Sequence, residues 1–170
     1  MTSNRSLCVV VLMVALTVSC SSPEKSSPNN PIAPSNPEAP PTASTNLESE
    51  LTFCVTETNR YRATLGRAAL TRSSALEAYA TIGAREDGLA HVGHQHFRST
   101  NGGGIASAEN ELPWWPGYNS IQGVIQQGLA MMWAEGPGGG HYENMRGPYT
   151  QLGCGVFVNG SEITVVQDFR

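Results

Sequence analysis

The sequence predicts an α+β domain of layered architecture. Three segments carry apolar residues at helical spacing: residues 46–66, 74–87 and 120–135. Two β-rich runs, Cys154–Val158 and Ile163–Phe169, come last and flank Asn159-Gly160, which is a strong hairpin-turn signal. Helices first and a hairpin last favour helices packed on a sheet, and no internal repeat suggests another architecture.

The first two predicted helices each follow a capping-box pattern. Thr45-x-x-Glu48 precedes the first helix, which ends at Gly66, and Ser74-x-x-Glu77 precedes the second, which runs to about Asp87. The residues that recur at helical spacing in the first helix are Leu51, Cys54, Val55, Thr58, Tyr61, Arg62 and Leu65. Both helices are therefore expected to bury one face.

The third predicted helix has the clearest stripe. Its members are Ile121, Val124, Ile125, Gly128, Leu129 and Met132. Glu135 lies three residues after Met132, on the continuation of the same stripe. The segment between the second and third helices, Gly88–Ser120, is rich in glycine, proline and polar residues, which predicts a long functional loop.

The N-terminal quarter of the chain, residues 1–45, is not expected to belong to this domain. Residues 1–19 contain Arg5 and then an uncharged apolar run, Leu7–Val18, which is typical of a secretion signal. The run leads into Leu16-Thr17-Val18-Ser19-Cys20, which resembles the bacterial lipoprotein signal with Cys20 as the lipidated residue. An ordinary signal peptide cleaved nearby, or an uncleaved anchor, is the alternative, and each would also export the domain. Residues 20–45 hold seven of the eleven prolines and predict an extended tether. Residues 46–170 remain as one domain.

The cysteine count predicts a disulfide, and the net charge limits the class of partner. Cys8 lies in the signal and Cys20 is the predicted lipidation site, which leaves Cys54 and Cys154 in the domain. We expect these two to form a disulfide in an oxidising compartment; two buried free thiols are the alternative. The net charge is −4 and no basic stripe occurs, which argues against nucleic acid as a partner.

Glu135 and His141 flank Gly136-Pro137-Gly138-Gly139-Gly140. A carboxylate at the end of an apolar stripe, where the helix dipole disfavours an anion, needs a cation, a metal or a proton. The glycines allow a sharp turn that would fold His141 back over Glu135. A solvated last-turn glutamate and an exposed loop imidazole remain the alternative.

The predicted loop carries more candidate ligands. His91, His94 and His96 cluster there, followed by Glu109. Histidines with carboxylates can bind zinc, although no compact motif such as H-E-x-x-H is present. Trp114 and Trp115 could stack on a sugar or lipid, or simply cover the core.

Several motifs, in order, resemble the CAP/SCP superfamily of cysteine-rich secretory proteins, venom antigens and plant pathogenesis-related proteins. Thr58-Asn59-Arg60-Tyr61-Arg62 resembles its H-N-x-x-R motif, with threonine at the histidine position. Ala108-Glu109-Asn110 resembles G-E-N, and Trp133-Ala134-Glu135 resembles W-x-E. Gly140-His141-Tyr142, followed by Tyr149–Gly155, resembles the bacterial G-H-Y signature and its strand.

The resemblance implies a three-layer α-β-α sandwich with a mostly antiparallel central sheet. It also implies a cavity tetrad made of Glu109, Glu135, His141 and one upstream histidine, either His94 or His96, with His91 fitting less well. Glu143 stands where the family usually has threonine and is expected to add a third acid near this cavity.

The function expected from this resemblance is that of an exported, lipid-anchored binding module. Its His/Glu cavity would hold zinc or another divalent cation beside a small lipid, sugar or peptide ligand. A zinc-dependent hydrolase and a structural envelope protein with a vestigial cavity are the alternatives. No G-x-S-x-G motif occurs, and a Cys54–Cys154 disulfide would leave no cysteine for catalysis, so the residues favour binding over enzymatic activity.

Overall fold

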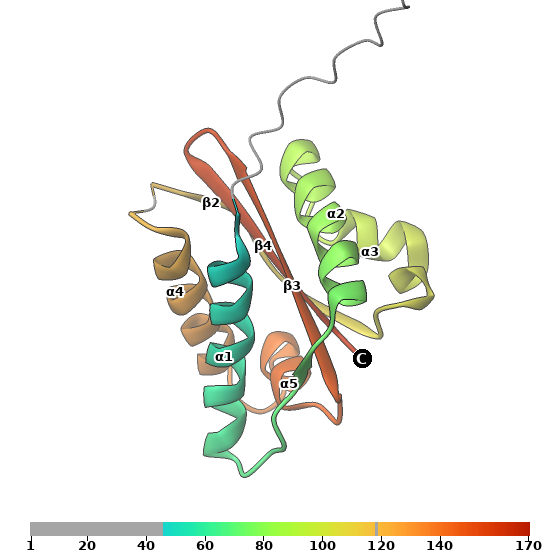
Figure 1. Cartoon of the computed structure of the whole chain (residues 1–170), viewed down its shortest axis with the longest axis vertical. Helices are drawn as coiled ribbons and strands as arrows, with labels where there is room; N and C mark the ends of the chain where they lie inside the picture. Colours follow the sequence, from blue (N-terminus) through green and yellow to red (C-terminus); the bar gives the residue numbers. More distant parts are fainter. Residues whose placement is uncertain (1–45, 118) are drawn as a thin grey trace, which may run out of the picture. The chain divides into compact units, whose positions relative to one another are not determined.

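A four-stranded sheet forms the middle layer of the structure, a computed structural model that describes residues 46–117 and 119–170 (Figure 1). Its strands are β1 (Thr71–Arg72), β2 (Ala108–Pro116), β3 (Gln151–Asn159) and β4 (Glu162–Phe169). The order is β1-β3-β4-β2. Only the short β1 runs parallel to its neighbour, so the described sheet is mixed and mostly antiparallel. The predicted signal peptide, Cys20 and tether lie outside the described residues.

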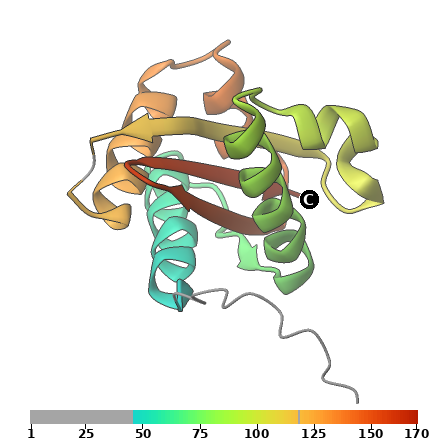
Figure 2. The ribbon, with the colours of Figure 1, turned by 90° about the horizontal axis from the view of Figure 1, so that it is seen from above.

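Helices cover both faces of this sheet (Figures 1 and 2). One face carries α1 (Glu48–Thr64), α4 (Ile121–Ala134) and α5 (Gly140–Arg146). The other face carries α2 (Ser74–Ala90) and α3 (Gln95–Thr100), followed by the 3-10 turn η1 (Asn101–Gly104). The predicted three-layer α-β-α sandwich is therefore confirmed.

The helix starts differ in detail from the predicted capping boxes. The N-cap of α2 is Ser73, whose side chain accepts a hydrogen bond from Leu76 N, and not Ser74. Leu47 caps α1 without a side-chain bond, and Thr45 lies outside the described residues. At α4, Ser120 caps Gly123 N at 3.0 Å. Each serine satisfies a backbone N–H that the first helical turn cannot.

The prediction that Gly88–Ser120 is a loop is wrong. This stretch contains the end of α2, then α3, η1 and strand β2. The sequence of β2, "AENELPWWP", lacks the usual strand pattern because polar residues occupy one face and prolines interrupt it. The strand sits at the edge of the sheet, beside β4 only, where prolines are tolerated.

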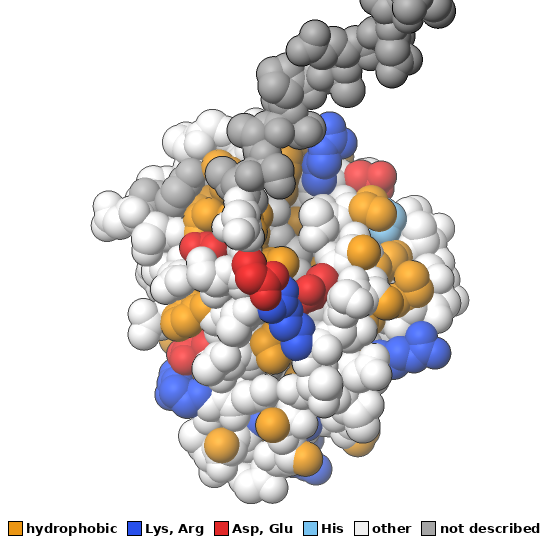
Figure 3. All heavy atoms as spheres, viewed as in Figure 1, with side chains coloured by type: hydrophobic (Ala, Val, Ile, Leu, Met, Phe, Trp, Pro, Cys, Tyr) orange, Lys and Arg blue, Asp and Glu red, His pale blue; other side chains and the backbone are white. Residues whose placement is uncertain are grey.

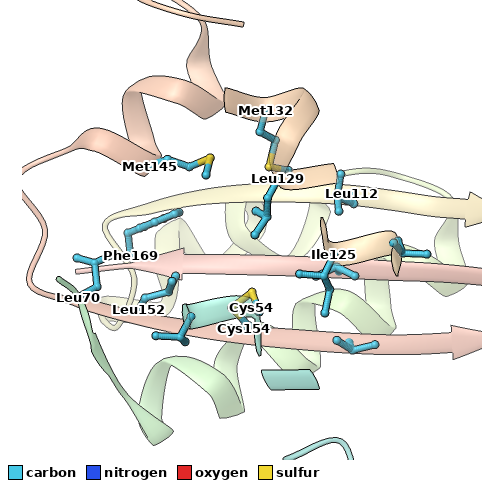
Figure 4. Close-up of a cluster of buried hydrophobic side chains, with 14 of the residues drawn as sticks. Cys54, Leu70, Leu112, Ile125, Leu129, Met132, Met145, Leu152, Cys154 and Phe169 are labelled. Atoms are coloured by element: carbon cyan, nitrogen blue, oxygen red, sulfur yellow. A yellow bond between two sulfur atoms is a disulfide. The ribbon is translucent and has the colours of Figure 1, made fainter. Parts of the chain in front are cut away.

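The main hydrophobic core lies between the sheet and the α1–α4–α5 layer (Figure 4). Ile125 and Leu129 of α4, Met145 of α5 and Phe169 of β4 are each at most 1% exposed. Cys54 of α1 and Cys154 of β3 form a disulfide at its centre, which confirms the predicted pairing. The bond spans 100 residues of sequence. A loop of that length corresponds to roughly 4–5 kcal/mol of stabilisation in the chain-entropy model.

The opposite interface, between α2 and the sheet, is built from small residues. Ala80, Ala84 and Val166 form its buried apolar cluster. Gly153 and Gly155 of β3 lie directly under the α2 backbone: a Cβ atom at Gly155 would stand 2.2 Å from Ala80 C. This close approach leaves little room for large apolar side chains on the α2 face.

The molecular surface in Figure 3 mixes acidic and basic side chains, and no large patch of one sign appears on this face. Arg72, for example, forms ion pairs with both Glu48 and Glu77. No helix among the described residues has the length and hydropathy needed to cross a membrane.

Candidate functional site

Strand β2 and the start of α3 bring His94, Glu109 and Glu111 together. Glu109 and Glu111 are alternate residues of one strand, so their side chains share a face. His94 Nδ1 lies 2.7 Å from Glu109 Oε1, and the His94 backbone N–H donates to Glu111 Oε2 at 2.5 Å. The left-handed backbone of His94 (φ 58°) allows both contacts from one residue. Each of the three residues offers a ligand atom, and these atoms lie within 4.8 Å of one another.

Burial controls the charge of this group. The side chains of Glu109 and Glu111 are at most 1% exposed. Burial raises the pKa of Glu111 to about 7, whereas the hydrogen bond with Glu109 raises the pKa of His94. These carboxylates would therefore favour either a protonated His94 imidazole or a bound metal cation.

A second pair forms between the helices α4 and α5. Glu135 is the C-cap of α4, and its Oε1 lies 2.5 Å from His141 Nδ1. Its Oε2 accepts the His141 backbone N–H at 3.1 Å. The hydrogen bond from His141 lowers the pKa of Glu135. The predicted contact between this carboxylate and imidazole is therefore present in the structure.

Glycines make this turn possible. Gly136 and Gly138 have φ values of 68° and 95°, in the region that only glycine adopts freely. At Gly139, a Cβ atom would stand 2.4 Å from Glu135 Cβ. A side chain at Gly139 would therefore force α5 away from α4 and separate His141 from Glu135.

Asparagine side chains connect the two halves. Asn110 Nδ2 donates to the His141 carbonyl at 3.2 Å, and Asn144 Nδ2 donates to the Glu109 carbonyl at 3.1 Å. Asn144 also donates to Asn110 Oδ1 at 2.9 Å. These bonds hold α5 against β2, and Glu135 and His141 line the same cavity as Glu111.

A cavity of about 280 Å³ opens where the two halves meet. Its walls are Glu111, Leu112, Gly128, Met131, Met132, Glu135 and His141. At Gly128 a Cβ atom would overlap Leu112, so the glycine brings α4 close to β2. The cavity therefore has one wall of Leu112 and two methionines, and a polar end formed by the Glu135–His141 pair.

The other histidines lie outside this group. His96, which the sequence could not distinguish from His94, bonds through Nδ1 to Glu86 at 2.8 Å on the α2 side. It is the His94 ring that contacts Glu109. His91 bonds to Glu162 at 2.9 Å, and its ring lies 5.3 Å from that of Trp114.

Two further residues were considered from the sequence. Glu143, expected to add a third acid near the cavity, pairs with Arg146 and accepts the Gly138 backbone N–H at 3.0 Å, in the turn between Glu135 and His141; it is not among the residues that line the cavity. Trp115 packs against the main core, which is the covering role that the sequence left open.

Sequence reasoning missed three acids at the site: Asp87, Glu111 and Asp168. Asp87 and Asp168 are fully buried on the α2 face of the sheet. Asp168 is the cross-strand partner of Glu109. Burial, reinforced by the neighbouring Glu109 and Asp87, raises the pKa of Asp168 to about 8. The alternation of Glu109 with Glu111 was a readable signal, but the pairing with Asp168 depends on strand register.

The chain is similar to one known protein family. The family model described as "CAP: Cysteine-rich secretory protein family" matches residues 55–169. A search of curated proteins finds no match.

Several solved structures are similar. Na-ASP-1 shares 20% identity and a TM-score of 0.53, over 79% of this chain and 39% of its own. A cysteine-rich secretory protein from Staphylococcus aureus shares 15% identity (TM-score 0.48, 76% of this chain, 40% of its own). Hookworm platelet inhibitor shares 16% identity (TM-score 0.49, 72% of this chain, 69% of its own). At 20% identity, the similarity to Na-ASP-1 shows a shared fold and nothing further.

The described chain spans about two-fifths of the Staphylococcus aureus protein and of Na-ASP-1. The family model, in contrast, covers most of this chain, and its match includes every motif from Thr58 to Gly155 that carried the resemblance. The chain belongs to the CAP family of cysteine-rich secretory proteins.

Proposed function

We propose that this chain is an exported, lipid-anchored CAP-domain binding module that holds a divalent cation beside its ligand cavity. The observation that carries the proposal is the convergence of His94, Glu109 and Glu111, whose ligand atoms lie within 4.8 Å of one another. One imidazole and two carboxylates are a suitable donor set for zinc, with further positions left to water or ligand. The cation would supply charge compensation and a point of attachment for a polar group.

Burial of Glu109 and Glu111 without a lysine or arginine partner supports the cation. Across residues 46–117 and 119–170, neither Glu109 nor Glu111 forms an ion pair with lysine or arginine. Buried carboxylates in this situation need a proton, a histidine or a metal. The adjacent cavity suits a ligand with an apolar body against Leu112, Met131 and Met132 and a polar group near Glu135–His141. A small lipid, a sugar or a peptide would meet that description.

Metal analysis of the purified chain tests the cation site. We expect zinc to bind to the wild type, and we expect His94→Ala and Glu111→Gln to weaken it by at least about 10-fold, because each removes a donor. His91→Ala is the matched control, since that histidine contacts Glu162 instead. The measurements are zinc content after dialysis and titration calorimetry. Unchanged zinc affinity in both site variants would contradict the proposal.

Export and anchoring are supported by the sequence of residues 1–20 and by the Cys54–Cys154 disulfide, because such bonds persist in oxidising compartments. We expect Cys20→Ser to move the chain from the membrane fraction to the soluble fraction of cells, since the acyl chains would be lost. Cys8→Ser is the control, because that cysteine lies within the apolar run. Continued sedimentation with membranes of a Cys20→Ser chain from which the apolar run Leu7–Val18 has been cleaved would refute lipid anchoring at this residue.

A further inference from the structure

A row of buried acids lies behind the cavity, on the face of the sheet that α2 covers. Glu109 of β2 and Asp168 of β4 are direct cross-strand partners, and Asp87 of α2 is buried above that face. Asp87 Oδ2, Glu109 Oε2 and both carboxylate oxygens of Asp168 are buried without a hydrogen-bond partner. Among the described residues, no lysine or arginine forms an ion pair with Asp87 or Asp168.

A buried imidazole joins these acids. His96 is 8% exposed. Its Nδ1 bonds to Glu86 and its backbone N–H donates to Asp87, but its Nε2 has no hydrogen-bond partner among the described residues. Buried polar atoms without a protein partner are rare in folded proteins, and a cluster of them indicates a place that can bind water or an ion.

Gly83 of α2 leaves a small space beside this cluster. The position where its Cβ atom would stand is 3.6 Å from His96 Cδ2, the ring atom bonded to Nε2, and 3.8 Å from Glu109 Oε2. A methyl-sized gap is therefore lined by an imidazole edge and a carboxylate oxygen. Glu109 presents its two oxygens to different neighbours, Oε1 to His94 and Oε2 to this gap.

We propose that Asp87, Glu109, Asp168 and His96 form a second, inner cation site, with Glu109 shared between it and the outer group of His94 and Glu111. Three carboxylates and one imidazole suit a divalent cation that prefers oxygen, such as Mn²⁺. A proton on Asp168 would neutralise one acid but leave the remaining oxygens and His96 Nε2 unpartnered. A cation can satisfy all four side chains together.

The two sites differ in how far they are preassembled. Only His94, Glu109 and Glu111 offer ligand atoms mutually within 4.8 Å in the described part of the chain. A cation in the inner site would have to draw Asp87 and Asp168 toward the gap at Gly83. The outer site is therefore expected to fill first, and the inner site at higher Mn²⁺ concentration.

Mn²⁺ stoichiometry of the full chain tests this inference. Equilibrium dialysis with detection by electron paramagnetic resonance should find two ions per chain in the wild type. Asp168→Asn removes one inner ligand at nearly constant shape. Gly83→Ala fills the gap at ordinary contact distances without a steric clash. Both variants should bind one ion. Glu162→Gln and Gly140→Ala are the matched controls, since both positions lie outside the two sites, and circular dichroism checks the fold.

Each outcome separates the inner site from the proposed function. One ion in the wild type that only His94→Ala removes would overturn the inner site and leave the outer one. One ion that Asp168→Asn and Gly83→Ala remove, while His94→Ala keeps it, would support the inner site and contradict the outer one. Two ions that survive both inner-site substitutions, or no bound ion at all, would overturn the inference.

Discussion

Replacing Gly155 with alanine is expected to destabilise the domain by more than about 3 kcal/mol. The new Cβ atom would stand 2.2 Å from both the carbonyl carbon and the oxygen of Ala80, and 2.4 Å from Thr81 N. These are backbone atoms of α2, so no side chain can rotate away and the whole helix must lift from β3. Because α2 also carries Asp87 and precedes His94, the displacement would reach the candidate site.

Urea denaturation of the oxidised protein measures this effect. Gly140→Ala provides the control, because a Cβ atom there would meet nothing within 4 Å, and alanine in a helix is favoured over glycine by about 1 kcal/mol. We expect the Gly140 variant to unfold at or slightly above the wild-type urea midpoint. A Gly155→Ala midpoint equal to that of the wild type would show that α2 does not pack on β3 as described.

The metal-free domain is expected to be more stable near pH 5.5 than near pH 8.5, by about 2–5 kcal/mol. Burial raises the pKa of Asp168 to about 8 and of Glu111 to about 7. An acid with a raised pKa binds a proton in the folded state that it has already lost in the unfolded state. Stability therefore falls as the pH rises from the unfolded pKa toward the folded one. The raised pKa of His94 acts in the same direction.

Thermal melts in the presence of a chelator check this dependence. Groups with lowered pKa values, such as Glu135 and Glu143, lose their contribution only at more acidic pH and do not oppose the trend in this window. Asp168→Asn should make the profile less steep, because the amide does not titrate, while Glu111 and His94 still contribute. A melting temperature that rises from pH 5.5 to pH 8.5 would contradict the burial of these acids.

The sequence predicted the layers of the fold better than it predicted the site. Regular stripes and the Asn159-Gly160 turn identified α1, α2, α4 and the terminal hairpin. Strand β2 was not predicted because its face toward α2 carries Glu109 and Glu111, and glutamate rarely occupies buried strand positions. Its other face, with Asn110 and Leu112, gave too short an apolar pattern to compensate.

The Glu135–His141 contact could be predicted because glycines join its two members locally. The choice between His94 and His96 could not, since it depends on the left-handed turn at His94 and on where α3 begins. The position of Asp168 beside Glu109 could not be predicted for a different reason. It lies 59 positions after Glu109, and only the β2–β4 register makes them neighbours. Local pattern carries no information about such a pairing.

The edge strands of the sheet determine whether two copies of this protein can pair through their sheets. At one border β1 is only two residues long; at the other, β2 includes Pro113 and Pro116, which have no N–H to offer a neighbouring chain. The β2 border therefore presents no long, regular row of free backbone donors. Two copies of this domain are therefore not expected to join their sheets through β2.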